Sequence, residues 1–324
     1  MAAEDGAVLA AGNPRTGLSV SFLDSRGQPR GAPLVVAGSE KHAVLEVAGA
    51  SSGSQVGFAW TERSESATAA HGVLGDSKTR SFAALLPLGE ASVGATEAGG
   101  RHIAFSISDK AEAMVLMRVR DEPCADAPDR SCAAFRFREL LSTGPELRGL
   151  PMSVPLPCSG GLAGFTLVGE RSHYAFCSEQ NGTPRVTAFM RQLSPFYVGV
   201  KSLASGCAPQ GALRLGDDAV FVLDCASGRR GVRIGGLDSD ERPLEVGQAT
   251  VSCELGRPRL RVPGQPPLSF DLGPPFEGLG PLLPERFGKA LHAVWTGSSL
   301  LVAEWRAGQV AVRAYECRGG ELAE

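Results

Sequence analysis

Four arginines occupy alternating positions in two neighbouring segments of the sequence, and together they could bind an anion. Arg118 and Arg120 lie in "LMRVRDE", and Arg136 and Arg138 lie in "AFRFREL". Both segments alternate apolar and polar residues, which predicts two strands of one hairpin. The predicted register sets Arg120 opposite Arg136 and Arg118 opposite Arg138. Because like charges directly opposite destabilise a sheet, either nearby acidic residues compensate these arginines or the ladder receives an anion.

Acidic residues could instead support glycoside cleavage. This reaction needs two carboxyl groups about 5 to 9 Å apart across a cleft, a distance that the sequence does not reveal. The candidates are Glu46, Glu62, Asp217, Asp218, Glu304 and Glu316. The chain has no nucleophile elbow, zinc-protease motif, phosphate-binding loop or dinucleotide fingerprint. We therefore expect no cofactor, and we keep a propeller-type glycoside hydrolase or lyase as the alternative to a binding protein.

Eight cysteines form an even set without any C-x-x-C spacing, which argues against zinc ribbons and thioredoxin-like motifs. Several of them flank segments that are typical of strand, turn and strand, so disulfides are the better interpretation. We expect no metal site. The predicted pairs are Cys124 with Cys132, Cys158 with Cys177, Cys207 with Cys225 and, by elimination, Cys253 with Cys317.

Predicted disulfides indicate an oxidising compartment, either extracellular, at a cell surface or periplasmic. The N-terminus "MAAEDGAVLAAGNPRTG" has no basic segment followed by a long apolar run. We therefore expect that an export signal is missing from this chain. The predominance of arginine over lysine, together with abundant alanine and glycine, suggests a bacterium with a GC-rich genome.

Bulk properties exclude several other classes. The formal net charge is -3 and 43% of the residues are hydrophobic, as in a soluble globular protein without an attraction for nucleic acid. No apolar run is long enough to span a membrane. The 41 glycines and 22 prolines are spread along the chain, which leaves little room for long helices.

Short apolar strand patterns recur about every 40 to 50 residues once one insertion is allowed, and each period has room for four strands. This pattern predicts an all-β fold, a single β-propeller over residues 1–324 with seven blades preferred and six as the second choice. Two β-sandwiches joined near residues 145–157 are the alternative. We expect the N-terminal strand to complete the last blade and so close the ring.

The segment "FLDSRGQPRGAPLVVAG", which begins at Phe22, resembles the blade sequence of secreted bacterial propeller-like repeat proteins, especially those of myxobacteria. The resemblance covers about 20 residues and implies a scaffold and an exported location, without any active-site residue. We therefore predict a non-enzymatic exported protein that binds a protein or a surface glycan on one face of the ring. A structural subunit of a surface assembly is a further possibility, and the sequence leaves the oligomeric state open.

Overall fold

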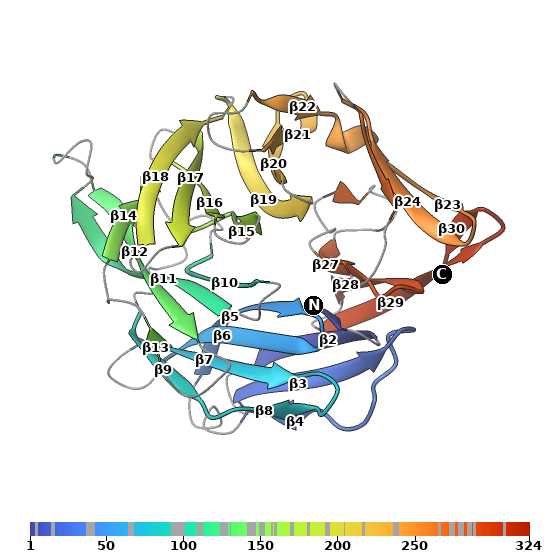
Figure 1. The fold of residues 1–324 in the computed structure, drawn as a ribbon, viewed down its shortest axis with the longest axis horizontal. Helices are drawn as coiled ribbons and strands as arrows, with labels where there is room; N and C mark the ends of the chain where they lie inside the picture. The colour runs from blue at the N-terminus through green and yellow to red at the C-terminus, as the bar shows by residue number, and fades with distance from the viewer. Residues whose placement is uncertain are drawn as a thin grey trace.

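The computed structural model shows seven small antiparallel sheets arranged around a common axis (Figure 1). The structure describes residues 1–3, 6–13, 17–36, 43–63, 68–91, 101–108, 113–123, 129, 131–140, 147–148, 153–156, 158, 161–168, 172–179, 182–191, 195–203, 205–215, 218–235, 240–264, 267–271, 276–277, 282–283, 287, 290–306 and 309–324. The all-β propeller that the strand pattern predicted is therefore confirmed.

We number the sheets in chain order. Sheet 1 contains β1 (Ala2–Ala3), β2 (Gly6–Asn13), β3 (Gly17–Asp24) and β4 (Leu34–Val35). Sheet 2 contains β5 (Ala43–Ser52), β6 (Gln55–Arg63), β7 (Thr68–Asp76), β8 (Ser81–Phe82) and β9 (Leu86–Glu90). Sheet 3 contains β10 (Ile103–Ile107), β11 (Ala113–Pro123), β12 (Ser131–Leu140), β13 (Leu147–Arg148) and β14 (Ser153–Leu156).

The second half of the chain repeats this arrangement. Sheet 4 contains β15 (Gly164–Val168), β16 (Ser172–Ser178), β17 (Pro184–Arg191) and β18 (Pro195–Ser202). Sheet 5 contains β19 (Cys207–Leu215), β20 (Asp218–Cys225), β21 (Gly228–Ile234) and β22 (Arg242–Leu244). Sheet 6 contains β23 (Thr250–Glu254), β24 (Arg257–Val262) and β25 (Leu268–Asp271). Sheet 7 contains β26 (Phe276–Glu277), β27 (Ala290–Trp295), β28 (Ser299–Arg306), β29 (Gln309–Arg318) and β30 (Glu321–Ala323).

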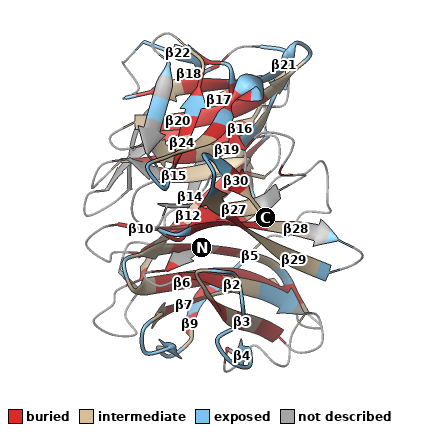
Figure 2. Cartoon of the chain, turned by 90° about the vertical axis from the view of Figure 1, so that its right-hand side faces the viewer, coloured by how far each residue is buried: buried red, intermediate tan, exposed pale blue. Residues whose placement is uncertain are grey.

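Strand burial follows the apolar pattern of the sequence. In β3, Leu18 and Val20 are buried whereas Ser19 between them is only partly buried, as a strand with one apolar face requires. In β6, every residue from Val56 to Glu62 is buried, because neighbouring sheets cover both faces of this strand. Figure 2 accordingly shows many buried residues, in red, on the strands of the sheets.

Sheets 2 and 3 pack against each other so closely that one position requires glycine. A Cβ atom at Gly57 of β6 would lie only 2.4 Å from the ring of Phe105 in β10. Any larger residue at position 57 would therefore push the two sheets apart. This contact aligns sheet 2 with sheet 3, whose two middle strands, β11 and β12, carry the four arginines.

The ring closes by packing between its first and last sheets. Ala7 and Leu23 of sheet 1 form one buried cluster with Val294 and Leu301 of sheet 7. We expected the N-terminal strand to join the last sheet, and this expectation is wrong, because β1 pairs with β2 in its own sheet. The five strands of sheet 7 all come from residues 276–323 and leave no such vacancy.

The blade count is six rather than the seven that we preferred. Among the described residues, six sheets have four or five strands, and sheet 6 has three. Sheet 6 is joined to sheet 7, since the Cys253 N–H donates to the Gly320 carbonyl oxygen at 3.0 Å and Cys253 is bonded to Cys317. The repeat period overestimated the count because sheet 6 resembles a blade in sequence, whereas three strands of it are present among the described residues.

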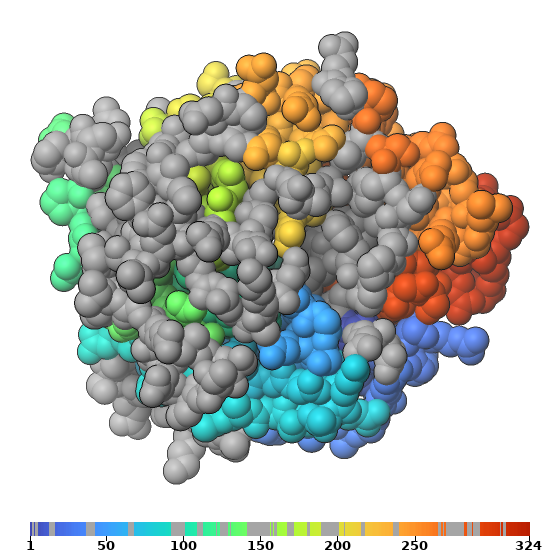
Figure 3. Space-filling model, in the orientation of Figure 1, coloured from blue at the N-terminus to red at the C-terminus, as the bar shows by residue number. Residues whose placement is uncertain are grey.

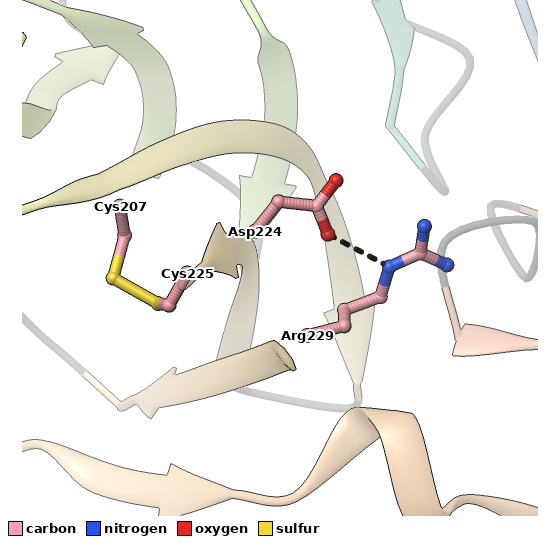
Figure 4. Close-up of a disulfide and its surroundings, with 4 residues drawn as sticks. All are labelled: Cys207, Asp224, Cys225 and Arg229. Carbon is pink, nitrogen blue, oxygen red and sulfur yellow. Dashed lines mark hydrogen bonds and ion pairs between the residues drawn. A yellow bond between two sulfur atoms is a disulfide. The ribbon is translucent and has the colours of Figure 1, made fainter. Parts of the chain in front are cut away.

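Three of the predicted disulfides are confirmed: Cys158–Cys177, Cys207–Cys225 and Cys253–Cys317. Cys207 and Cys225 are direct partners in the β19–β20 register, with their Cα atoms 4.2 Å apart (Figure 4). The fourth predicted pair includes Cys124, which lies outside the described residues, so it stays a prediction, although Cys132 is itself disulfide-bonded.

Helical structure is almost missing from the described ranges. Helical conformation is confined there to the 3-10 turn η1 (Val246–Gln248) and to the single described residues Leu282 and Phe287. No helix in this part of the chain has the length and apolar character needed to cross a membrane.

Candidate functional site: an arginine pair between two sheets

The hairpin that carries the four arginines forms, but not with the predicted register. The expected ladder of opposed arginines is wrong, because Arg120 is paired with Ala134 and not with Arg136, and a bulge between Arg118 and Arg120 shifts the remaining pairs of β11 and β12 further. The observed partners are Arg118 with Phe135, Arg120 with Ala134, Met117 with Arg136 and Val115 with Arg138.

The register sends the arginines to different surroundings. Arg118 shares a face with the aromatic residues that pack toward sheet 4. Arg136 and Arg138 lie on the other face, beside strand residues that pack toward sheet 2. The Arg120 side chain is 71% exposed, and its Nε lies 2.6 Å from Oε1 of Glu122. Only Arg136 and Arg138 therefore remain together at the junction of sheets 2 and 3.

Both members of this arginine pair reach β9 of sheet 2. Arg138 Nε donates a hydrogen bond to the carbonyl oxygen of Leu88 at 3.2 Å. Arg136 Nη1 lies 3.4 Å from the position that a Cβ atom would take at Gly89, whose φ is +111°. Gly89 thus leaves open the space beside the Arg136 guanidinium group, and no side chain of β9 covers it at that point.

The described part of the chain supplies no counter-charge to the arginine pair. Among the residues that the structure describes, no carboxylate forms an ion pair with Arg136 or Arg138. Arg136 Nε is buried and has no hydrogen-bond partner within this set. Burial and, to a smaller extent, the charge of Arg136 lower the pKa of Arg138 below its usual value. Two partly buried cations with unused donors are suited to an anion.

The acidic candidates, by contrast, are held by separate partners. Glu46 accepts from the His102 backbone, and Glu62 from Trp60 and His71; Asp218 pairs with Arg233, Glu304 with Arg313, and Glu316 with Arg318 and Arg26. Asp217 lies outside the described residues. Glu46 is opposite Thr61 in the β5–β6 register, so it points to the other face from Glu62. Each described acidic candidate therefore has its own partner, and Glu46 and Glu62 do not share a face of sheet 2.

A buried polar cluster connects strands β6 and β7 of sheet 2. Oε2 of Glu62 accepts a hydrogen bond from Trp60 Nε1 at 3.1 Å, and Oε1 lies 3.0 Å from His71 Nε2. The His71 ring also stacks on Trp60, with 5.7 Å between ring centroids. Glu62 is only 3% exposed, so these contacts compensate a buried carboxyl group.

Two other histidines belong to β27 or directly precede β10, two strands near the centre of the ring in Figure 1. Both carboxylate oxygens of Glu46 in β5 lie 3.0 Å from the backbone N–H of His102, which precedes β10. On β27, burial lowers the pKa of His292 to about 3, assisted by the positive charges of the amino terminus and Arg101. His292 is therefore neutral at physiological pH. Within the described residues, no three side chains gather as metal ligands.

The sequence identified Arg136 and Arg138 but not the residues of β9 that they approach. The Leu88 carbonyl and Gly89 lie about 50 residues away in the chain, and no local pattern links them to β12. The buried cluster of Trp60, Glu62 and His71 was missed as well, although the spacing of Trp60 and Glu62 by two residues on a strand was a usable signal.

Comparison with other proteins gives a fold but no family. No family model matches the sequence, and no curated protein matches it. A provisionally assigned 6-phosphogluconolactonase from Bacteroides uniformis is similar over 98% of both chains, with a TM-score of 0.51 and 10% sequence identity.

Two further solved structures resemble the chain less closely. The sialidase of Trypanosoma rangeli matches 98% of this chain and 59% of its own, with a TM-score of 0.44 and 10% identity. The Aleuria aurantia lectin matches 94% of this chain and 92% of its own, with a TM-score of 0.39 and 10% identity. The solved structures that resemble the chain thus include both enzymes and a sugar-binding protein. The similarity extends to the fold alone, and by that fold the chain is a β-propeller.

Proposed function

We propose that the protein is an exported, non-enzymatic binding protein that recognises an anionic group on a surface glycan or protein. The observation that carries this proposal is the arginine pair, Arg136 and Arg138. Their guanidinium groups lie at one sheet junction without an acidic partner in the described residues. A carboxylate, sulfate or phosphate would supply the missing acceptor oxygens.

The surroundings of the arginine pair support a ligand more than a merely solvated surface. An exposed arginine turns its donors to water, as Arg120 does with 71% exposure and one ion pair. Arg136 instead buries its Nε without a partner, which is costly unless an acceptor arrives. Three disulfides are consistent with an extracellular or periplasmic location, where such a ligand would be presented.

The test uses charged polymers as probes. Binding of oligogalacturonate, which carries carboxylates, and of dextran sulfate is measured by titration calorimetry against neutral dextran. We expect Arg136→Ser combined with Arg138→Ser to lower affinity for the preferred anionic probe at least about tenfold, because two charge-assisted contacts are lost. Arg120→Ser is the matched control on the same hairpin and should keep the wild-type affinity.

Three results would contradict the proposal. They are wild-type protein that binds neither anionic polymer, equal binding of neutral dextran, and unchanged affinity in the double variant. Thermal unfolding of each variant separates lost binding from lost folding. Loss of affinity in the double variant together with collapse of its melting temperature would show that the arginine pair is structural. Affinity that falls with added salt is expected if the contact is ionic.

A further inference from the structure

The turn between β23 and β24 places a leucine where the backbone favours glycine or asparagine. Leu255 has φ of +52° and Gly256 has φ of +75°, in a two-residue turn flanked by the paired residues Glu254 and Arg257. Positive φ at both central residues defines the type I′ hairpin turn, for which Asn-Gly is the preferred sequence. A leucine in this conformation is strained.

An adjacent turn shows how the same geometry is normally satisfied. Gly319 and Gly320 connect β29 to β30 with φ of +58° and +89°. Glycine adopts this conformation without steric cost. The two hairpins are joined by the Cys253–Cys317 disulfide. Of these two turns, the one between β23 and β24 has a large side chain at a strained position, and the one between β29 and β30 has two glycines.

The Leu255 side chain is not packed in the protein interior. It is 104% exposed, whereas the other exposed large apolar residues, Leu34, Val35 and Leu45, are 39 to 46% exposed. A scattered apolar residue on a surface is common, but here full exposure coincides with backbone strain. Neither packing nor turn geometry accounts for a leucine at this position.

The support beneath the turn is rigid. Cys253 is bonded to Cys317, and its N–H donates to the carbonyl oxygen of Gly320 at 3.0 Å. On the other strand, Arg259 and Arg261 approach the Glu254 carboxylate at 2.9 and 2.5 Å. β23 and β30 lie side by side at the edge of the ring in Figure 1, and the orange and red surfaces meet at this edge in Figure 3. A preorganised tip loses little conformational entropy on binding.

We propose that Leu255 is the apolar anchor of a docking surface for a folded protein partner. The partner offers an apolar pocket of leucine size with a carboxylate at its border. The carboxylate pairs with Arg257, an exposed cation that has no acidic partner among the described residues. A central apolar anchor surrounded by charged residues is the usual composition of an energetic centre in a protein interface. This surface is separate from the arginine pair and does not depend on it.

The experiment locates the partner and then measures its binding. A photoreactive leucine analogue at position 255 alone is crosslinked in the envelope fraction of the source organism, with the same analogue at position 34 as control. The protein crosslinked only from position 255 is identified by mass spectrometry, purified and titrated against the full chain. We expect Leu255→Asn to lower its affinity at least about tenfold without lowering the melting temperature, because Asn-Gly suits the turn.

Further variants separate the contributions. Arg257→Gln should weaken binding less than Leu255→Asn and only at low salt. Leu34→Asn should leave affinity unchanged, as should the variant that lacks both Arg136 and Arg138. The proposal is overturned if Leu255→Asn binds the partner with the same affinity as the wild type, or if no crosslinked adduct is specific to position 255. An adduct with lipid or with a second copy of this chain would overturn it as well.

Discussion

Sheets 2 and 5 are equivalent modules of the ring that are stabilised in different ways. Sheet 2 contains no cysteine and encloses the Trp60, Glu62 and His71 cluster. Sheet 5 has the Cys207–Cys225 disulfide at the end of its first hairpin. A similar antiparallel arrangement thus depends on a buried polar network in one place and on a covalent bond in another. Reducing conditions and core substitutions should consequently affect different parts of the ring.

Two polar contacts of equal length sharpen this contrast. Asp224 Oδ1 lies 3.0 Å from Arg229 Nε, close to the Cys207–Cys225 disulfide, and both side chains are about two-fifths exposed (Figure 4). The Glu62–His71 contact has the same 3.0 Å distance, but there the side chains are only 4% and 15% exposed. Equal distances therefore correspond to unequal energies, because water screens the first contact and not the second.

The largest effect is expected for Glu62→Leu. This change leaves the buried Trp60 N–H and His71 without their acceptor, and it should lower the free energy of unfolding by about 3 kcal/mol or more. Urea unfolding followed by tryptophan fluorescence measures it. Glu62→Gln keeps an acceptor oxygen and should cost less. If Glu62→Leu leaves the free energy of unfolding unchanged, the cluster does not stabilise sheet 2.

A somewhat smaller effect is expected when Cys207 and Cys225 are both replaced by serine. Opening a loop of 18 residues should lower the free energy of unfolding by about 3 kcal/mol in the chain-entropy model. Arg229→Gln is the neighbouring control and should cost less than about 1 kcal/mol, because its ion pair is exposed. Equal losses in the two variants, measured by urea unfolding under oxidising conditions, would contradict the contrast between covalent and ionic support.

The smallest effect concerns a turn of sheet 2 in acid. Hydrogen bonds from the Thr79 backbone and from Ser54 lower the pKa of Asp76 below its usual value. The folded state therefore releases this proton more readily than the unfolded chain does. The resulting stabilisation is present above the unfolded pKa near 3.8 and is lost as pH falls through the lower folded value.

Asp76→Asn should accordingly flatten this part of the curve of stability against pH and cost about 1 kcal/mol at neutral pH. Thermal unfolding between pH 2 and pH 7, a range of about 5 units, measures it. Asp224→Asn is the control in sheet 5. A variant at position 76 whose acid profile equals that of the wild type would show that these hydrogen bonds do not stabilise the turn.

Local pattern predicted much of the fold. Alternation around Leu18 and Val20 identified a strand with one buried face, and cysteines at the ends of strand–turn–strand segments identified two disulfides. These features depend on neighbours in the sequence, whereas Cys253–Cys317 was paired by elimination. The blade count and the closure at β1 were wrong because they depend on pairing between distant strands, which the repeat period does not determine.

The candidate site was only partly predictable. The arginines at positions 136 and 138 were identified, but the strand pairing was displaced from the predicted one already at Arg120, and a bulge beside Arg118 displaced it further. Neither the turn geometry nor a bulge can be read from the composition of the strands. The contact of Arg138 with Leu88 joins two sheets and has no sequence signal. The strand pattern thus placed the arginines on strands but did not place them at a sheet junction.

The Cys253–Cys317 disulfide has a mechanical consequence. It encloses a segment with a sequence separation of 64 residues, which includes nearly all of β24 through β29. Tension applied between the first and last residues of the chain would pass through the sulfur atoms and bypass this segment. This bond alone would shorten the fully extended molecule by roughly 210 Å. Single-molecule stretching under oxidising conditions of the wild type and of a variant with both Cys253→Ser and Cys317→Ser would measure that difference.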